Sequence, residues 1–140
     1  MIYFSMHDCP PCREFTALLT ELYIDMNQAE THFEVVFVSC DKTAEQFHEY
    51  YSEMPWLAMP FQDPRIKNLA KTFKVRGVPR LVVLNPKSGA VIADQAVDLI
   101  SAQGPVIIEE WMEKLWRALY ALRGITALDD ALHYNTSNQN

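Results

Sequence analysis

The 140-residue chain has few cysteines, no long apolar run and few basic residues, and each of these shortages excludes a class of protein. Three cysteines are too few for a secreted scaffold held together by disulfides. No apolar run approaches the roughly 18 residues that a membrane helix needs, so we expect no membrane contact. Basic residues are also scarce, 12 against 18 acidic ones, and the net charge of -6 argues against a nucleic-acid partner. What the chain does have is 49% hydrophobic residues, enough for a globular core.

The amino-terminal residues predict where the protein works. Residues 1–5 contain neither a basic segment nor a long apolar segment, so they lack the features of a secretory signal. With Met1 as the natural start, we expect the protein in the cytoplasm, with the nucleus as a second compartment. The cytosol is reducing, so neighbouring cysteines there are expected to cycle between dithiol and disulfide rather than form a permanent bridge.

Hydrophobic periodicity predicts the helices and strands. Apolar runs at 2–5 and 33–39 predict two buried strands. Between them, apolar residues recur every three or four positions, which predicts an amphipathic helix from Pro10 or Pro11 to about residue 29. The other expected elements are a helix capped at Asp41 or Thr43 and ending near 53, a helix at 64–73, hairpin strands at 80–84 and 90–93, and a helix at 106–122.

This order of elements, β-α-β-α-α-β-β-α, predicts an α/β fold. A parallel crossover unit comes first, and such crossovers are right-handed almost without exception. A hairpin and a packing helix follow. The pattern resembles a thioredoxin-like fold, with a central mixed four-stranded sheet flanked by helices. We assign residues 1–125 to this domain and residues 126–140 to a short helix and a frayed tail.

Two of the three cysteines form the motif Cys9-Pro10-Pro11-Cys12 where the first helix is expected to begin. This spacing puts the two thiols within disulfide reach across one turn. A helix N-terminus carries unpaired N–H groups and roughly half a positive charge, which together stabilise a thiolate at Cys9. Cys9 is therefore the predicted nucleophile, and Cys12 the thiol that resolves its mixed disulfide. We expect this redox-active disulfide to work without a cofactor.

A single CxxC pair is also half of a four-ligand zinc site. The chain has no second CxxC, and the set that could complete a site is His7, Cys9, Cys12 and Cys40. A cysteine pair between a strand and a helix is more typical of redox chemistry, which we favour over metal binding.

Gly77-Val78-Pro79 stands just before the expected third strand. Alone, Pro79 would be interpreted as an ordinary trans proline, because only about 5% of such bonds are cis. With a CxxC upstream in this topology, we expect a cis proline beside Cys9. The Val78 backbone would then be exposed for strand-like pairing with a substrate segment that contains a cysteine.

Taken together, these segments resemble the tryparedoxin and nucleoredoxin branch of the thioredoxin superfamily. The likeness runs from about residue 2 to 93, and its most specific parts are the double proline between the cysteines and the Met-Pro-Trp-Leu-Ala sequence at 54–58. It implies a thiol-disulfide oxidoreductase that acts on protein or low-molecular-weight disulfides and is recharged by an upstream thiol reductant. The alternative is a redox-sensitive binding module with little turnover.

One departure from the family concerns the residue before the first cysteine, usually tryptophan and here Asp8. An anion at this position would favour the thiol of Cys9 over its thiolate. Asp8 could instead cap the following helix from the solvent side. Both interpretations of Asp8 as an active-site support residue stay open.

The chain also suggests where a partner would dock. Residues 64–93 hold seven basic and no acidic side chains. We hypothesise that Arg76 and Arg80, on either side of Pro79, select acidic or glutathione-like partners. Trp56 is a third possible docking residue, because its segment lies near the active-site side in the family.

Overall fold

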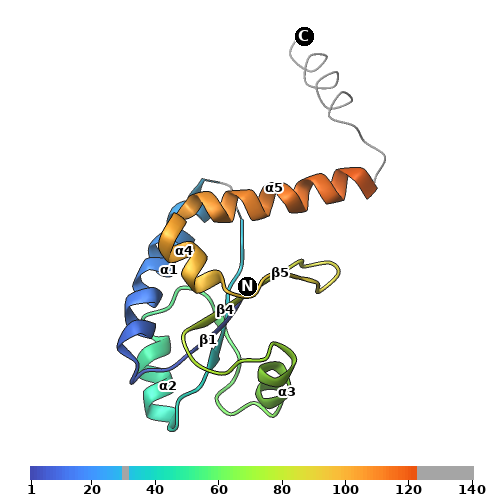
Figure 1. Cartoon of the computed structure of the whole chain (residues 1–140). Coiled ribbons are helices and arrows are strands. Elements are labelled where there is room, and N and C mark those ends of the chain that lie inside the picture. The colour runs from blue at the N-terminus through green and yellow to red at the C-terminus, as the bar shows by residue number, and fades with distance from the viewer. Residues whose placement is uncertain (30–31, 123–140) are drawn as a thin grey trace, which may run out of the picture.

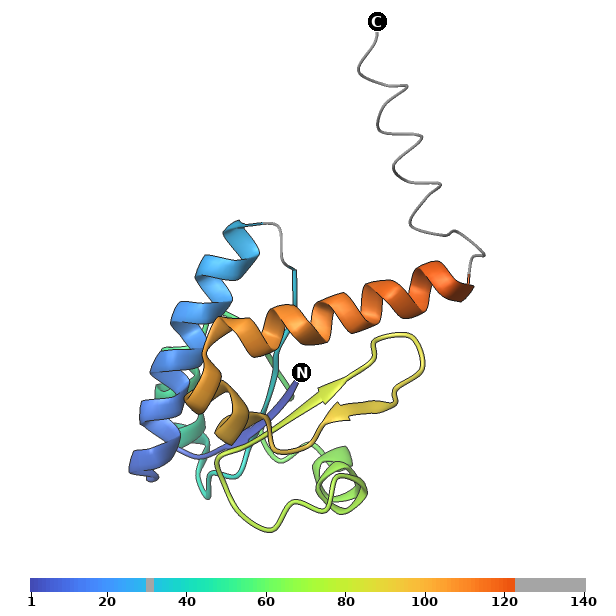
Figure 2. The same cartoon turned by 45° about the horizontal axis from the view of Figure 1, so that its top comes forward.

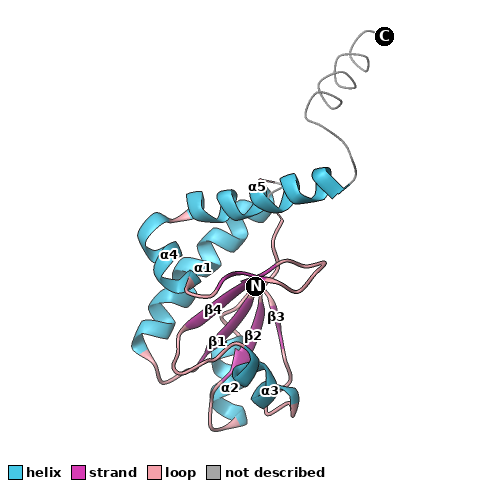
Figure 3. Ribbon diagram, turned by 45° about the vertical axis from the view of Figure 1, so that its right-hand side comes forward, coloured by secondary structure: helices cyan, strands magenta, loops and turns pink. Residues whose placement is uncertain are grey.

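The computed structural model describes residues 1–29 and 32–122, and β1 (Ile2–Ser5) runs through the middle of its sheet (Figure 1). β1 pairs in parallel with β2 (Val36–Ser39) and antiparallel with β4 (Arg80–Leu84). With β3 (Leu57–Ala58) and β5 (Val91–Ala93) at the edges, the order is β3-β2-β1-β4-β5. The sheet is mixed, as expected, and Figure 3 shows it between its covering helices.

One face of the sheet carries the main hydrophobic core. Tyr3, Phe37 and Leu81 point to this face from three adjacent strands and are fully buried. The helices that contribute buried residues to the same cluster are α1 (Pro10–Gln28), α2 (Ala44–Tyr51), α4 (Ala96–Gln103) and α5 (Pro105–Leu122).

The opposite face is covered differently. The alternate strand residues Phe4, Val38 and Val82 point there and are also fully buried. α3 (Arg65–Thr72) lies on this side of the sheet (Figures 1 and 3), and Phe73 just after it lines a hollow together with Val82. α5 extends beyond the sheet at one end, as Figure 2 shows.

The prediction of four strands is wrong, because Leu57–Ala58 forms a fifth. It pairs in parallel with β2 through Val36↔Leu57 and Phe37↔Ala58. Two residues are too few for a periodic pattern, and neighbouring prolines indicate only a break in a helix.

The helix Ala96–Gln103 was not expected either. It is eight residues long, and its N-cap Gln95 makes no side-chain capping bond, so it lacks a start signal. Gly104, with φ of 63°, separates it from α5, which begins at Pro105. The expected order therefore lacked one strand and one helix.

Other boundaries shift by a few residues. β2 begins at Val36 rather than at 33. The Asn27 side chain forms hydrogen bonds with both backbone groups of Phe33, donating to its carbonyl at 3.2 Å and accepting from its N–H at 3.0 Å, so Phe33 does not pair within the sheet. α2 is capped by Thr43, as one alternative had it, but ends at Tyr51.

The expected domain boundary at 125 and the tail at 126–140 lie outside the described residues. No helix in 1–29 or 32–122 has the length and apolar character to cross a membrane.

Candidate active site

Cys9 and Cys12 form a disulfide at the N-terminus of α1, with their Cα atoms 5.2 Å apart. Cys9 is the N-cap residue, with extended backbone, and the helix begins at Pro10. The buried strand β1 ends four residues earlier, at Ser5, so the loop at 6–8 places the disulfide beyond the end of this central strand.

The two prolines determine which backbone group meets the Cys9 sulfur. Pro10 and Pro11 occupy the first two helical positions and have no N–H to offer. The first available N–H is that of Cys12, which donates to Cys9 Sγ at 3.3 Å. This N–H and the dipole of the 19-residue helix both favour negative charge on that sulfur.

The two sulfurs differ in their accessibility. Cys12 is 0% exposed, whereas Cys9 is partly exposed. An incoming disulfide can therefore reach Cys9 first, and Cys12 is positioned to act only on a group already bound to Cys9.

The Val78–Pro79 peptide bond is cis, as the sequence context predicted. Pairing of β1 with β4 sets Phe4 opposite Arg80, which brings the preceding proline loop to the end of the sheet where the disulfide lies. Cys9 Sγ lies 4.0 Å from the Val78 carbonyl oxygen. The partly exposed sulfur of Cys9 thus faces the backbone of the cis-proline loop.

Four buried hydroxyl groups form a continuous chain beneath the disulfide, and Tyr3 begins it. Its hydroxyl donates to the Cys12 carbonyl oxygen at 3.2 Å and is 2.9 Å from Thr16 Oγ1. Thr16 Oγ1 is 2.6 Å from the Tyr50 hydroxyl, which is 2.9 Å from Ser5 Oγ. Burial raises the pKa of Tyr3, so this phenol stays protonated.

This hydroxyl chain extends what the sequence predicted. Tyr3 also packs in the core, where its ring meets that of Phe15 edge-on with the ring centroids 5.7 Å apart. Thr16 had one signal in the sequence, its position one turn after Cys12 on the buried helix face. The contacts of Tyr50 join residues 34 and 45 positions apart, and no local pattern predicts them.

Asp8 does not cap α1, because the Cys9 side chain fills the capping position. The Asp8 carboxylate instead accepts a hydrogen bond from Gln46 Nε2 at 2.5 Å and lies 2.7 Å from His7 Nδ1. His7 Nε2 is 3.5 Å from a Glu49 carboxylate oxygen. The hydrogen bond to Asp8 is the main cause that raises the pKa of His7. The interpretation of Asp8 as a helix cap is therefore wrong, and Asp8 lines the same hollow as Cys9.

The three expected docking residues have different surroundings. Trp56 is only 3% exposed and packs edge-on against Tyr3 and Tyr23, so it belongs to the core and its expected docking role is wrong. The Arg80 guanidinium is 3.5 Å from a carboxylate oxygen of Asp94. Arg76 is exposed to solvent.

The metal alternative finds no support in the described part of the chain. Cys9 and Cys12 are bonded to each other, and Cys40 is exposed and unbridged. Residues 1–29 and 32–122 contain no group of three or more His, Cys, Asp or Glu side chains arranged to hold a metal ion.

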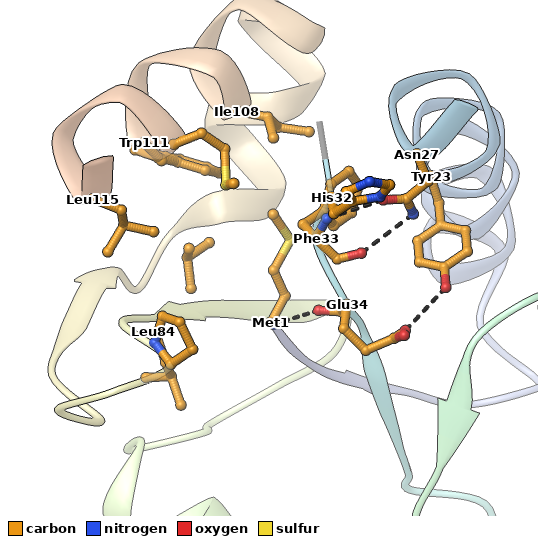
Figure 4. Close-up of a pocket in the computed structure, with 13 residues that line it drawn as sticks. Met1, Tyr23, Asn27, His32, Phe33, Glu34, Leu84, Ile108, Trp111 and Leu115 are labelled. Carbon is orange, nitrogen blue, oxygen red and sulfur yellow. Dashed lines mark hydrogen bonds between the residues drawn. The ribbon is translucent and has the colours of Figure 1, made fainter. Parts of the chain in front are cut away.

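An apolar pocket of about 600 Å³ lies away from this chemistry (Figure 4). Trp111 and Leu115 line it from α5, and Tyr23 lines it from the end of α1. Tyr23 is 11 residues along the helix from Cys12, or about 16 Å at the rise of an α-helix. Among the polar side chains of this pocket, the Tyr23 hydroxyl donates to Glu34 at 3.1 Å, and Asn27 bonds the backbone of Phe33.

A mixed sheet, a cysteine pair at the start of the first long helix and a facing cis proline define a protein of the thioredoxin-like class. The family model described as thioredoxin-like matches residues 1–91. The solved tryparedoxin from Trypanosoma brucei is 43% identical with a TM-score of 0.69, and the match covers 74% of this chain and 72% of that one. The chain belongs to the thioredoxin-like oxidoreductase family, in its tryparedoxin and nucleoredoxin branch.

Two further relatives show the range of this branch. Probable nucleoredoxin 1 from Arabidopsis thaliana is 51% identical over 104 residues, which are 74% of this chain and 18% of that protein. A structure of tryparedoxin II complexed with glutathionylspermidine is 39% identical with a TM-score of 0.68, over 73% of this chain and 71% of that one. The chain spans about a fifth of the length of the nucleoredoxins that it matches.

Proposed function

We propose that this protein is a dithiol-disulfide oxidoreductase in which Cys9 is the nucleophile and Cys12 the resolving thiol. The observation that carries the proposal is the difference between the two sulfurs. Cys9 is partly exposed, accepts a hydrogen bond from the Cys12 N–H at 3.3 Å and faces the Val78 carbonyl, whereas Cys12 is fully buried behind it.

The reaction runs in two exchanges. The Cys9 thiolate attacks one sulfur of a substrate disulfide, forms a mixed disulfide and releases the other sulfur as a thiolate. The Cys12 thiol then gives up its proton and attacks Cys9 Sγ, which restores the Cys9–Cys12 disulfide and releases the reduced substrate. An upstream dithiol supplies two electrons to regenerate the protein. The disulfide is the only redox group that this cycle needs.

The proposed substrates are disulfides of proteins or of low-molecular-weight thiols. The tryparedoxin II structure with glutathionylspermidine supports the second class, because a small thiol compound occupies a relative with this fold. A dithiol that cycles needs a reducing compartment, so the proposal places the protein in the cytoplasm or the nucleus.

Mass spectrometry of purified variants tests the roles of the two cysteines. We expect reduced Cys12→Ser to accumulate one mixed disulfide on Cys9 when mixed with a peptide disulfide, and Cys9→Ser to form none at the motif. Equal adducts in both variants would contradict the assignment. Cys40→Ser is the matched control, because this thiol is exposed but outside the motif, and it should turn over at the wild-type rate.

The carboxylate of Asp8 favours a second candidate, a redox-sensitive binding module with little turnover, because a negative charge beside Cys9 opposes thiolate formation. The rate of steady-state disulfide reduction distinguishes the two candidates. An oxidoreductase reduces many equivalents of a disulfide when dithiothreitol is supplied. A binding module forms the adduct of Cys12→Ser but does not accelerate this reduction.

A further inference from the structure

Two hollows lie beside the paired prolines of the motif. Pro10 and Cys9 line one hollow, which has a volume of about 540 Å³. Pro11 and Pro79 line the other, which has about 500 Å³. When a substrate cysteine reaches Cys9 along the cis-proline loop, both hollows are within reach of the side chains that flank it.

The hollow beside Pro10 is negatively charged. Asp8 and Glu49 line it with exposed side chains, and His7 lies between their carboxylates, 2.7 Å from the first and 3.5 Å from the second. Arg13 also lines this hollow, but its guanidinium is 2.6 Å from the carboxylate of Glu53, which is outside the lining. Arg13 is thus neutralised from outside the hollow. Even with His7 protonated, the two carboxylates of Asp8 and Glu49 share only one positive charge.

The hollow beside Pro11 repeats this arrangement. Glu14 and Asp98 line it with exposed carboxylates. Arg80 lines it too, but its guanidinium is 3.5 Å from Asp94, again outside the lining. Within residues 1–29 and 32–122, neither Glu14 nor Asp98 has a lysine or arginine at ion-pair distance.

We infer that the preferred substrate is a protein disulfide whose cysteine is flanked by lysine or arginine residues. This inference rests on the proposed function and names the substrate class of the same site. A basic side chain on either side of the cysteine can form charge-assisted hydrogen bonds with the unneutralised carboxylates. The net charge of -6 attracts the same substrates at longer range. The preference is opposite to the one expected from Arg76 and Arg80, because the Arg80 guanidinium already has a carboxylate partner in Asp94, at 3.5 Å.

Three symmetric peptide disulfides test the inference, with lysine, glutamine or glutamate on both sides of the cysteine. The measurement is the rate constant for release of peptide thiol by the fully reduced protein. Each rate is divided by that for dithiothreitol, because a neighbouring lysine makes any cysteine a better leaving group. We expect the corrected rate for the lysine peptide to exceed that for the glutamate peptide about tenfold.

Two double variants locate the preference. Asp8→Asn with Glu49→Gln neutralises the hollow beside Pro10, and Glu14→Gln with Asp98→Asn neutralises the other. Each should lower the lysine-to-glutamate ratio about threefold. A change in the intrinsic reactivity of Cys9 would alter the rates for both peptides equally, so it cancels in this ratio. The matched control changes the net charge equally on α5, where Glu109→Gln with Glu110→Gln should leave the ratio unchanged.

The outcomes separate this inference from the proposed function. If the glutamine peptide is not reduced, the proposed function itself fails. If it is reduced but the corrected ratio is one or lower, or neither hollow variant changes the ratio, the inference alone is wrong. A preference for the glutamate peptide that disappears in Arg76→Ala would overturn it in favour of acidic partners.

Discussion

Cys9 performs two tasks with one side chain. Its sulfur is the accessible member of the disulfide, and it also accepts the N–H of Cys12 as the cap of α1. Serine caps a helix well and alanine poorly, so the two replacements are not equivalent at this position. Cys9→Ser removes the reactive thiol and keeps an acceptor for that N–H, which makes it the cleaner variant.

His7 supplies a pH-dependent contact beside the disulfide. Its pKa is raised above the ordinary 6.5, first by the hydrogen bond to Asp8. A group whose pKa is higher in the folded state contributes its full stabilisation below the unfolded pKa and loses it as pH rises through the folded one. We therefore expect His7→Asn to lower the free energy of unfolding at pH 5.5 and to change it much less at pH 9, as measured by urea denaturation.

The partner of His7 provides the control. In an Asp8→Asn background the main cause of the raised pKa is absent, so the effect of His7→Asn at pH 5.5 should shrink. A loss of stability that is the same at both pH values, or the same with and without Asp8, would contradict this account of the contact.

At the scale of the elements, α5 contains two tryptophans in contrasting environments. Trp111 is 4% exposed and belongs to the main core, whereas Trp116 is 54% exposed and stacks on Tyr120. We expect Trp111→Ala to lower the free energy of unfolding by about 3–5 kcal/mol. Trp116→Ala, the same change five positions later, should stay within about 0.5 kcal/mol of wild type. Equal losses by chemical denaturation would show that α5 packs differently.

The elements that could be predicted from sequence had local signals. α1 was placed correctly, because prolines suit its first turn and its apolar residues recur with helical spacing. The hairpin strands were found because a turn sequence separates two apolar runs. β3 and α4 were missed because two residues carry no period and Gln95 gives no capping signal.

The candidate site was predictable to a similar degree. The disulfide and the cis Pro79 were expected, because each depends on a motif and its place in the order of elements. The burial of Trp56 and the partners of Asp8 were not, because they depend on which helix packs beside which loop. Gln46, which binds Asp8, is 38 residues away in the sequence.

At the scale of the whole molecule, the net charge of -6 should influence encounters with charged substrates. We expect reduction of cystamine, a dication, to slow as ionic strength rises from 20 to 500 mM, because salt screens the attraction. Reduction of an anionic disulfide, dithiodipropionate, should accelerate over the same range. Hydroxyethyl disulfide is the neutral control, and one salt response shared by all three would contradict electrostatic steering.

Because β1 is the central strand, the active site forms only when its neighbouring strand β4 has paired with it. The reactive sulfurs follow β1 directly, but the backbone opposite them precedes β4, some 70 residues later, and arrives only when β4 aligns against β1. A fragment ending before Pro79 would keep both cysteines and lose the surface that receives a partner. Such a peptide would exchange disulfides like any small dithiol, so selectivity belongs to the folded domain and not to the four-residue motif.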